Sequence, residues 1–291
     1  MSMLETNKLY CMDNLELLKS LDSNSIDLIY CDILYNTGKK FKDYDDNLGT
    51  PQEAMEWYKP RLIEMKRVLK DTGSIYLQCD QNINYLIRNL CNKVFGIENF
   101  INEIIWHYKT YQGKAKNFFP RKHDTIFLYS KTNNYTFHLL KDKNYEKTID
   151  FKRWKKYLNE NNEIVYGNHP TTDSRFDSYC NKFIKENNRN PKNGDVILKI
   201  EGLTVDTVWD IKAVDPKSKE RVDYNTQKPK ELLERIIKAS SNEGDIVADF
   251  FMGSGTTCVV AKELGRKYIG CDINPRAIEI TNGRLNEMNE W

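Results

Sequence analysis

Short apolar segments alternate with helical stretches through most of the 291 residues of this chain. Seven apolar segments lie at 9–12, 27–31, 74–79, 103–107, 125–130, 245–249 and 267–271. Residues 51–70, 82–94, 229–239 and 256–264 have apolar side chains at helical spacing, and Asn274-Pro275 begins a last helix. Strands separated by helices pair in parallel within a sheet that is covered on both faces. The sequence therefore predicts an α/β fold in which the segments 103–107 and 125–130, with no clear helix between them, pair antiparallel.

Length and composition exclude several classes of protein. A chain of 291 residues with 40% hydrophobic residues can bury one large core, with or without an insert, and is not expected to be disordered. Seven cysteines without a Cys-x-x-Cys pair, and four scattered histidines, predict reduced thiols and no bound metal. Cys31, Cys79 and Cys271 each end an apolar segment and are expected to be small buried side chains. No apolar segment reaches membrane-spanning length and the N-terminus has no apolar signal core, so we expect a cytoplasmic protein without a membrane anchor.

The region from 107 to 193 interrupts the alternation of strands and helices and is strongly basic. It holds 18 Lys and Arg against 9 Asp and Glu, a local charge of +9, whereas the whole chain has a net charge of +2. Within it, Lys152, Arg153, Lys155 and Lys156 are interleaved with Tyr145, Phe151 and Trp154. Basic side chains neutralise phosphates and aromatic rings stack on bases, so this cluster indicates a nucleic-acid contact. The alternative is a solvated lysine-rich surface, which is the more common role of any single lysine.

A glycine-containing loop follows the apolar segment 245–249. The sequence Asp249-Phe-Phe-Met-Gly253-Ser-Gly255-Thr256-Thr257 ends a strand in an acid, lets the backbone approach a ligand and begins a helix. The next apolar segment leads to Asp272, 19 residues after Gly253, about the separation at which an acid binds ribose hydroxyls. Cys258 stands where a dinucleotide site has its third glycine, and no phosphate-binding Lys-Ser/Thr follows. We therefore expect a nucleoside ligand without a diphosphate; the alternative is an ordinary tight turn between strand and helix.

The apolar segment 27–31 leads directly into Asp32-Ile33-Leu34-Tyr35, an acid and an aromatic residue separated by two apolar residues. By itself this pattern is typical of a strand end whose Asp caps a turn and whose Tyr packs in the core. Beside a nucleoside site, the same pattern predicts a carboxylate that accepts hydrogen bonds from an amine and a ring that stacks on a base.

Four motifs occur in a fixed order: Asp32-Ile-Leu-Tyr35, Asn102-Glu-Ile-Ile-Trp106, Thr226-Gln-Lys-Pro229 and Phe251-Met-Gly-Ser-Gly-Thr-Thr257. This order resembles that of the beta-group S-adenosylmethionine-dependent DNA amino-methyltransferases, in which the catalytic motif precedes the cofactor-binding motif and a recognition region lies between them. The resemblance implies a class I methyltransferase fold: a seven-stranded mixed sheet with one antiparallel strand and helices on both faces. It divides the chain into a catalytic half at 1–130, a target-recognition insert at 131–205 and a cofactor-binding half at 206–291. The strand ends that bear Asp32 and Phe251 are expected to flank the point where the strand order reverses.

The resemblance implies transfer of a methyl group from S-adenosylmethionine to the N6 amine of an adenine flipped out of double-stranded DNA. Asp32 and the carbonyl of Ile33 are expected to accept hydrogen bonds from this amine, and Tyr35 to stack on the base. The residues that match the family's cofactor site are Asp13, Lys228, Phe251, Gly253, Gly255, Thr256 and Asp272. Within this set the resemblance places Asp272 on the ribose, and Thr256 and Lys228 near the methionine end. Asp13 is expected to contact the cofactor's adenine amino group, or to cap a helix that begins at Leu15.

The partners that the family suggests, besides DNA, are a cognate restriction endonuclease and a second copy of the chain. Three alternatives to adenine methylation remain open. N4 methylation of cytosine usually has a motif that begins with Ser rather than Asp, so Asp32 favours adenine. A DNA-binding relative without activity is suggested only by the altered catalytic motif. A nicotinamide dehydrogenase is disfavoured by the missing third glycine.

The catalytic motif departs from the family's Asp-Pro-Pro-Tyr, because Ile33 and Leu34 replace both prolines. Proline fixes its own backbone and restricts the residue before it, so we expect a looser loop here. Restoring both prolines is then expected to leave the rate unchanged or to raise it modestly, unless Ile33 and Leu34 pack against neighbours that have adapted to them.

Overall fold

A computed structural model describes residues 5–108, 116–142 and 145–288. It contains two compact units, Met1–His138 with Asp206–Trp291, and Leu139–Val205. The second unit starts at Leu139, and the residues just before it bond to the first unit. The backbone amide of Thr136 donates to the carbonyl of Thr72 at 3.0 Å, and that of His138 donates to the carbonyl of Ala239 at 2.7 Å.

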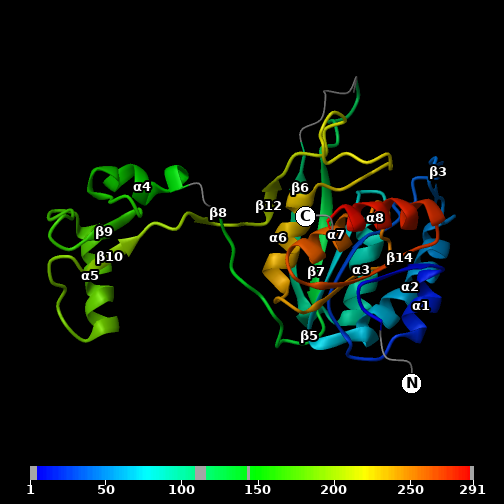
Figure 1. Ribbon diagram of the computed structural model, residues 1–291, viewed down its shortest axis with the longest axis horizontal. Coiled ribbons are helices and arrows are strands. Elements are labelled where there is room, and N and C mark those ends of the chain that lie inside the picture. Colours follow the sequence, from blue (N-terminus) through cyan, green and yellow to red (C-terminus); the bar gives the residue numbers. More distant parts are fainter. Residues whose placement is uncertain (1–4, 109–115, 143–144, 289–291) are drawn as a thin grey trace. The chain divides into compact units, whose positions relative to one another are not determined.

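An eight-stranded sheet organises the first unit (Figure 1). Its strands are β1 (Lys8–Cys11), β2 (Ile26–Asp32), β5 (Leu69–Cys79), β6 (Phe100–His107), β7 (His123–Ser130), β12 (Val208–Asp210), β13 (Ile246–Asp249) and β14 (Lys267–Asp272). The order is β1-β14-β13-β2-β5-β7-β6-β12, and β7 pairs antiparallel with β5 and β6 while the other pairs are parallel. All seven apolar segments form strands, and the expected antiparallel pair is confirmed.

The expected count of seven strands is one short, because β12 has no apolar run to mark it. Only Trp209 is buried in this strand, while Val208 and Asp210 are exposed. It extends the sheet through parallel pairing with β6, where Trp209 lies opposite Trp106. The indole nitrogen of Trp106 donates to the carbonyl of Ile211 at 2.9 Å, which fixes the segment just after β12 against β6.

Six helices cover the sheet in two layers (Figure 1). They are α1 (Asn14–Ser20), α2 (Pro51–Val68), α3 (Asn84–Phe95), α6 (Lys230–Ser240), α7 (Thr256–Glu263) and α8 (Pro275–Glu287). Parallel crossovers are right-handed, so helices that carry the chain in opposite directions along the sheet lie on opposite faces. The helices α1, α2 and α3 therefore pack together on one face, and α6, α7 and α8 pack on the other. Local signals begin these helices, such as the capping box of Thr50 and Glu53 at α2 and the N-cap Asn274 before Pro275 at α8.

The strand order reverses between β2 and β13, which are hydrogen-bonded neighbours. From β2 the chain proceeds to β5 on one side, and from β13 it proceeds to β14 on the other. The carboxyl ends of these strands open a crevice at such a point, where ligands bind in open α/β sheets. This position of Asp32 and of the loop after β13 confirms the expectation from the sequence.

The second unit has a small core of its own, made by Trp154, Ile164, Phe176 and Ile197. It comprises β8 (Lys141–Asp142), η2 (Tyr145–Lys147), α4 (Ile149–Trp154), η3 (Lys155–Tyr157), β9 (Glu163–Val165), α5 (Ser174–Asn187), β10 (Val196–Lys199) and β11 (Leu203–Thr204). The smaller elements of the first unit are β3 (Lys39–Lys40), β4 (Asp45–Asp46) and η1 (Ile97–Asn99).

Cys31, Cys79 and Cys271 are free and buried, as expected, whereas Cys11 at the end of β1 is free and exposed. Burial raises the pKa of each of these three buried thiols, which keeps them protonated and unreactive. Within the described residues, every helix is too short or too polar to cross a membrane.

Candidate active site

A cavity of about 370 Å³ opens at the carboxyl ends of β2 and β13. It is lined by nine of the ten residues predicted for catalysis and cofactor binding: Asp13, Asp32, Ile33, Tyr35, Lys228, Phe251, Gly253, Thr256 and Asp272. These residues come from both halves of the first unit, which the sheet brings together at the point where the strand order reverses. Gly255 is the predicted residue that does not line this cavity.

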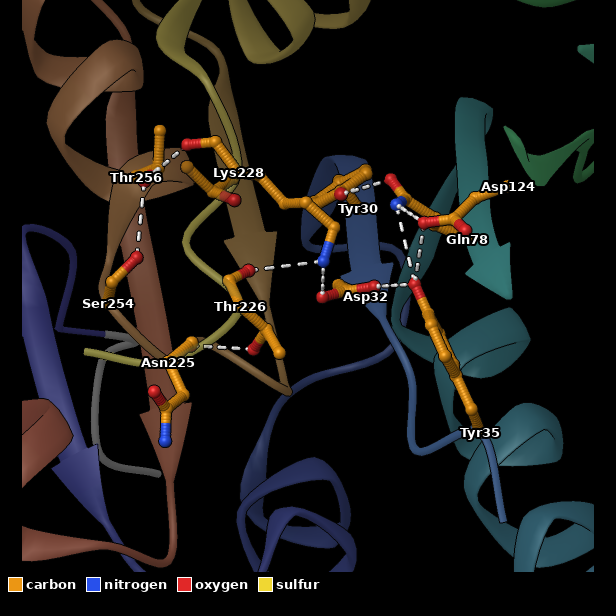
Figure 2. A network of polar contacts seen from close by, with 12 residues as sticks. Tyr30, Asp32, Tyr35, Gln78, Asp124, Asn225, Thr226, Lys228, Ser254 and Thr256 are labelled. Atoms are coloured by element: carbon orange, nitrogen blue, oxygen red, sulfur yellow. Dashed lines mark hydrogen bonds and ion pairs between the residues drawn. The ribbon is translucent and has the colours of Figure 1, made fainter. Parts of the chain in front are cut away.

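Asp32 ends β2, and its carboxylate has a partner on each oxygen (Figure 2). Oδ1 accepts a hydrogen bond of 2.6 Å from the hydroxyl of Tyr35, and Oδ2 forms an ion pair with the ammonium of Lys228. Burial raises the pKa of Asp32, and the positive charge of Lys228 opposes that rise. Asp32 is thus a desolvated acceptor beside a cation, in reach of any amine that enters the cavity.

Lys228 lies at the carboxylate of Asp32, and the family pattern also predicts a position for it near the methionine end of the cofactor. Besides pairing with Asp32, its ammonium donates to the carbonyl of Thr226 at 3.2 Å. Thr226 has φ +62°, a conformation that costs a β-branched residue about 1 to 3 kcal/mol. The hydroxyl of Thr256 donates to the carbonyl of Lys228 at 3.2 Å and so ties this segment to the glycine loop (Figure 2). Thr256 therefore holds the backbone that presents Lys228.

The loop after Asp32 is fixed by side chains rather than by prolines. The buried Asp46 accepts from the backbone amides of Tyr35, Asn36 and Thr37 at 2.7, 3.1 and 2.9 Å. The hydroxyl of Tyr58 donates to the carbonyl of Leu34 at 2.8 Å. These bonds give the loop contacts that can order it in the absence of the family's prolines.

The two positions of the missing prolines differ in what they contact. Ile33 is 5% exposed, packs in the main core and donates its backbone N–H to the carbonyl of Gln78 at 3.2 Å. Leu34 is only partly buried, and its carbonyl, which proline would retain, is the group that Tyr58 binds. Proline at 33 would therefore remove a hydrogen bond and core packing, while proline at 34 keeps the bond that is present.

We therefore expect Ile33→Pro to lower stability by about 1 to 3 kcal/mol and to reduce the methylation rate. Leu34→Pro should change both by little. Thermal unfolding and turnover of the two single variants measure this difference. Equal stability and turnover of the two variants, or faster turnover by Ile33→Pro, would contradict this expectation. Either result would indicate that the loop is too flexible without the prolines.

The glycine loop binds the carboxylate of Asp272. The amide of Gly253, at φ +53°, donates to Oδ2 of Asp272 at 2.8 Å, and the amide of Asn274 donates to Oδ1 at 2.9 Å. Each oxygen keeps a further lone pair for a ligand hydroxyl. Gly255 has a packing role, because a Cβ there would lie 2.2 Å from the side chain of Thr281.

Aromatic side chains line the cavity next to Asp13. The ring of Phe251 lies 6.0 Å from that of Trp57, and the guanidinium of Arg61 lies 3.5 Å from the ring of Trp57. Asp13 accepts from the amide of Leu15 at 2.8 Å with one oxygen and from Arg61 at 2.7 Å with the other. The helix-capping alternative for Asp13 is therefore correct, and the same side chain also lines the cavity.

Asp249 anchors the start of the glycine loop. Its buried carboxylate accepts from the hydroxyl of Thr257 at 2.5 Å and from the amide of Phe251 at 3.0 Å. Burial raises the pKa of Asp249 to about 7. Asp249 therefore stabilises the turn between β13 and α7 through hydrogen bonds inside the turn.

In the second unit, α4 and η3 present the predicted basic cluster. Lys152, Arg153, Lys155 and Lys156 are all exposed. Trp154, expected to stack on bases, is instead 1% exposed, and its indole nitrogen donates to Asp173 at 2.7 Å. Phe151 and Tyr157 are only partly buried, with the ammonium groups of Lys155 and Lys156 over their rings at 5.7 and 4.8 Å.

A family model described as DNA methylase matches residues 26–283 of this chain. The chain belongs to this family of DNA methylases. The methylase is 34% identical over 280 residues to the type II methyltransferase M.HpaI of Haemophilus parainfluenzae, with 96% of this chain and 74% of the relative covered. It is 32% identical over 282 residues to the DNA adenine methyltransferase YhdJ of Escherichia coli, with 96% and 82% covered. The resemblance predicted from the four motifs is confirmed, and the protein is a DNA methyltransferase.

Solved structures confirm the fold of the methylase. PvuII DNA methyltransferase, described as cytosine-N4-specific, superposes with a TM-score of 0.62 at 17% identity, covering 97% of this chain and 86% of that chain. A DNA modification methylase of Thermus thermophilus, solved with S-adenosylmethionine, gives a TM-score of 0.57 at 19% identity, covering 96% and 93%.

Sequence reasoning missed two residues near the carboxylate of Asp32 in the methylase. Gln78 and Asp124 are 0% and 7% exposed and lie beside Tyr35 (Figure 2). A polar residue inside the otherwise apolar segment 74–79 was the available signal for Gln78, because a buried polar group needs partners. Asp124 directly precedes the segment 125–130 and gave no such signal.

Proposed function

We propose that the methylase transfers a methyl group from S-adenosylmethionine to the N6 amine of an adenine flipped out of double-stranded DNA. The observation that carries this proposal is the convergence of Asp32, Tyr35 and Asp272 on one cavity. S-adenosylmethionine is the methyl donor and supplies an electrophilic sulfonium methyl group when bound. The residues present fit this ligand, since Asp272 offers lone pairs to ribose hydroxyls and Phe251 and Trp57 provide an aromatic wall.

The exocyclic amine of adenine is a weak nucleophile because its lone pair is delocalised into the ring. Acceptors for its two N–H bonds favour the pyramidal nitrogen, in which the lone pair is available for attack. Asp32 and the carbonyl of Ile33 are the acceptors in this proposal, and Tyr35 stacks on the flipped base. The amine becomes acidic as it is methylated, so Asp32 can take its proton without being a strong base.

Lys228 gives the carboxylate of Asp32 a counter-charge before the base arrives. Ion pairing favours the ionised form of an acid whose burial favours the neutral form. We propose that Lys228 keeps Asp32 ionised as an acceptor, and that Asp13 serves the cofactor's adenine end of the cavity.

Adenine is favoured over cytosine by Asp32, because the N4 group of the family usually has Ser at this position. The similarity to the E. coli adenine methyltransferase supports the same choice. The fold similarity to a cytosine-N4-specific enzyme does not separate the two, because the family shares one fold.

The second unit is the target-recognition region in this proposal, with double-stranded DNA as its partner. A cognate restriction endonuclease and a second copy of the chain are further proposed partners, based on the family. The exposed basic residues of α4 and η3 support DNA binding, since they can reach phosphates without disturbing the core of the unit.

Replacing Lys152, Arg153, Lys155 and Lys156 together with Gln is expected to weaken DNA binding and to reduce its salt dependence. The slope of log affinity against log salt should fall by about 0.9 for each side chain that neutralises a phosphate. Cofactor affinity should not change. A matched variant with Lys182, Lys185, Lys192 and Lys199 replaced by Gln makes the same charge change elsewhere in the unit. An unaltered slope in the first variant, or equal effects of both, would identify the cluster as a solvated surface.

Single-molecule sequencing of DNA from a methylation-free host that expresses the protein tests the proposed function. We expect modified adenines within one recurrent sequence. Modified cytosines, or DNA without modification despite soluble protein and bound cofactor, would refute it.

A further inference from the structure

The hydroxyl of Tyr35 lies between two carboxylates, only one of which has a role in the proposed mechanism (Figure 2). Its oxygen is 2.6 Å from Oδ1 of Asp32 and 3.1 Å from Oδ2 of Asp124. A phenol has a single hydrogen to donate, so it can satisfy only one of these acceptors at a time. The shorter bond places the hydrogen on the Asp32 side in this structure.

Asp124 is built into the fold as a fixed acceptor. Gln78 donates to its Oδ2 at 2.8 Å, and the hydroxyl of Tyr108 donates to its Oδ1 at 3.1 Å. The amide of Gln78 is itself oriented by the hydroxyl of Tyr30, which donates to the amide oxygen at 2.7 Å. Tyr30 and Gln78 are 1% and 0% exposed, so this arrangement cannot rearrange without disturbing the sheet.

In the proposed mechanism, Asp32 accepts hydrogen bonds from the target amine. In this structure each of its two oxygens already has a partner, Tyr35 on one and Lys228 on the other. Each oxygen can accept a second hydrogen bond, but a second donor shares its negative charge and weakens the bond to the first. Asp32 therefore binds the amine most strongly when the hydroxyl of Tyr35 moves away, and a buried hydroxyl without an acceptor is unfavourable by about 1 to 3 kcal/mol. Asp124 is within hydrogen-bond distance and does not line the cavity, so it can receive the hydroxyl without competing for the base.

We infer that Asp124 is a positioning residue that takes the Tyr35 hydroxyl when Asp32 accepts the target amine. As the base enters, the hydroxyl of Tyr35 changes its hydrogen-bond acceptor from Asp32 to Asp124. This bond keeps the ring of Tyr35 in place while the ring stacks on the base. This inference rests on the proposed function, because it requires an amine that competes for Asp32.

The test is a double-mutant cycle with Asp124→Asn and Tyr35→Phe. Asparagine keeps the shape of the side chain and an acceptor for Gln78, but it removes the charge. Charge-assisted hydrogen bonds are roughly twice as strong as neutral ones, so the hydroxyl then stays on Asp32. We expect Asp124→Asn to lower kcat roughly tenfold in the enzyme with Tyr35, and to change kcat less than about twofold in the Tyr35→Phe background.

Three controls separate this role from a structural one. Cofactor affinity and melting temperature of Asp124→Asn should match those of the parent. Tyr108→Phe removes a different donor to Asp124, on its Oδ1, without touching the Tyr35 hydroxyl, and it should change kcat less than about twofold. Asp124→Asn should weaken binding of DNA with adenine at the target position more than binding of DNA with purine there, because purine lacks the amine that competes for Asp32. In the Tyr35→Phe variant, adding Asp124→Asn should leave this difference unchanged.

Equal losses of kcat in the parent and Tyr35→Phe backgrounds would overturn the inference, because a structural defect does not depend on the hydroxyl. No loss in either background would overturn it as well. Both results leave an active adenine methyltransferase, so they are distinct from failure of the proposed function, in which the parent enzyme itself does not methylate adenine.

Discussion

Replacing Asp32 with Asn is expected to lower the rate of methyl transfer by about 10²- to 10⁴-fold while cofactor affinity stays within a few fold. Asn has the same shape but presents an NH₂ group where one carboxylate oxygen accepts hydrogen bonds. It cannot take the proton of the methylated amine, and it leaves the ammonium of Lys228 without its ion pair. The effect belongs to the transition state, so it should appear in kcat rather than in cofactor binding.

Single-turnover kinetics with saturating DNA and cofactor measure this rate directly. Asp45→Asn is a matched control, because Asp45 is an exposed aspartate that lines the same cavity. We expect it to retain nearly the full rate. A fully active Asp32→Asn enzyme would show that the catalytic acceptor lies elsewhere.

Replacing Asp272 with Ala is expected to weaken cofactor binding by about 10- to 100-fold, which corresponds to roughly 1.5 to 3 kcal/mol for charge-assisted hydrogen bonds. The carboxylate is held by the amides of Gly253 and Asn274 at the end of β14, and Asp272 lines the cavity. Burial raises its pKa, so the carboxylate is a poorly solvated acceptor that gains from donor hydroxyls. DNA binding in the absence of cofactor should not change.

Calorimetric titration with cofactor and a DNA-binding assay on the same preparations separate these effects. Asp272→Asn retains one acceptor oxygen for the loop and is expected to lose less affinity than Asp272→Ala. Comparable losses of cofactor and DNA affinity in both variants would indicate a damaged loop and would remove Asp272 from the ribose site.

The sequence predicted the parts of the fold that carry strong local patterns. Apolar segments of four to six residues became the sheet, and the last helix begins at Asn274-Pro275 as expected. The strand β12 was not predicted, because its single buried residue, Trp209, produces no periodic pattern in the sequence. The order of four motifs indicated the family, and the fold brings residues from three of those motifs to one cavity.

What the sequence could not provide is the pairing between distant side chains. Lys228 lies 196 residues after Asp32, and nothing in the motif that contains Lys228 specifies an ion pair with this carboxylate. Asp46 holds the loop after Asp32 by accepting hydrogen bonds from three backbone amides. These bonds form only because β4, which contains Asp46, lies next to this loop in the fold. The network of Gln78, Asp124 and Tyr30 arises only when β2, β5 and β7 lie side by side.

The most direct test of the proposed function is the identity of the methylated nucleoside. Purified protein is incubated with unmethylated DNA and S-adenosylmethionine that carries a deuterated methyl group, and the digested DNA is analysed by mass spectrometry. We expect labelled N6-methyladenine with the wild-type chain, and its near-complete loss with Asp32→Asn. Labelled N4-methylcytosine, or labelled N6-methyladenine in equal amounts from both proteins, would contradict the proposal.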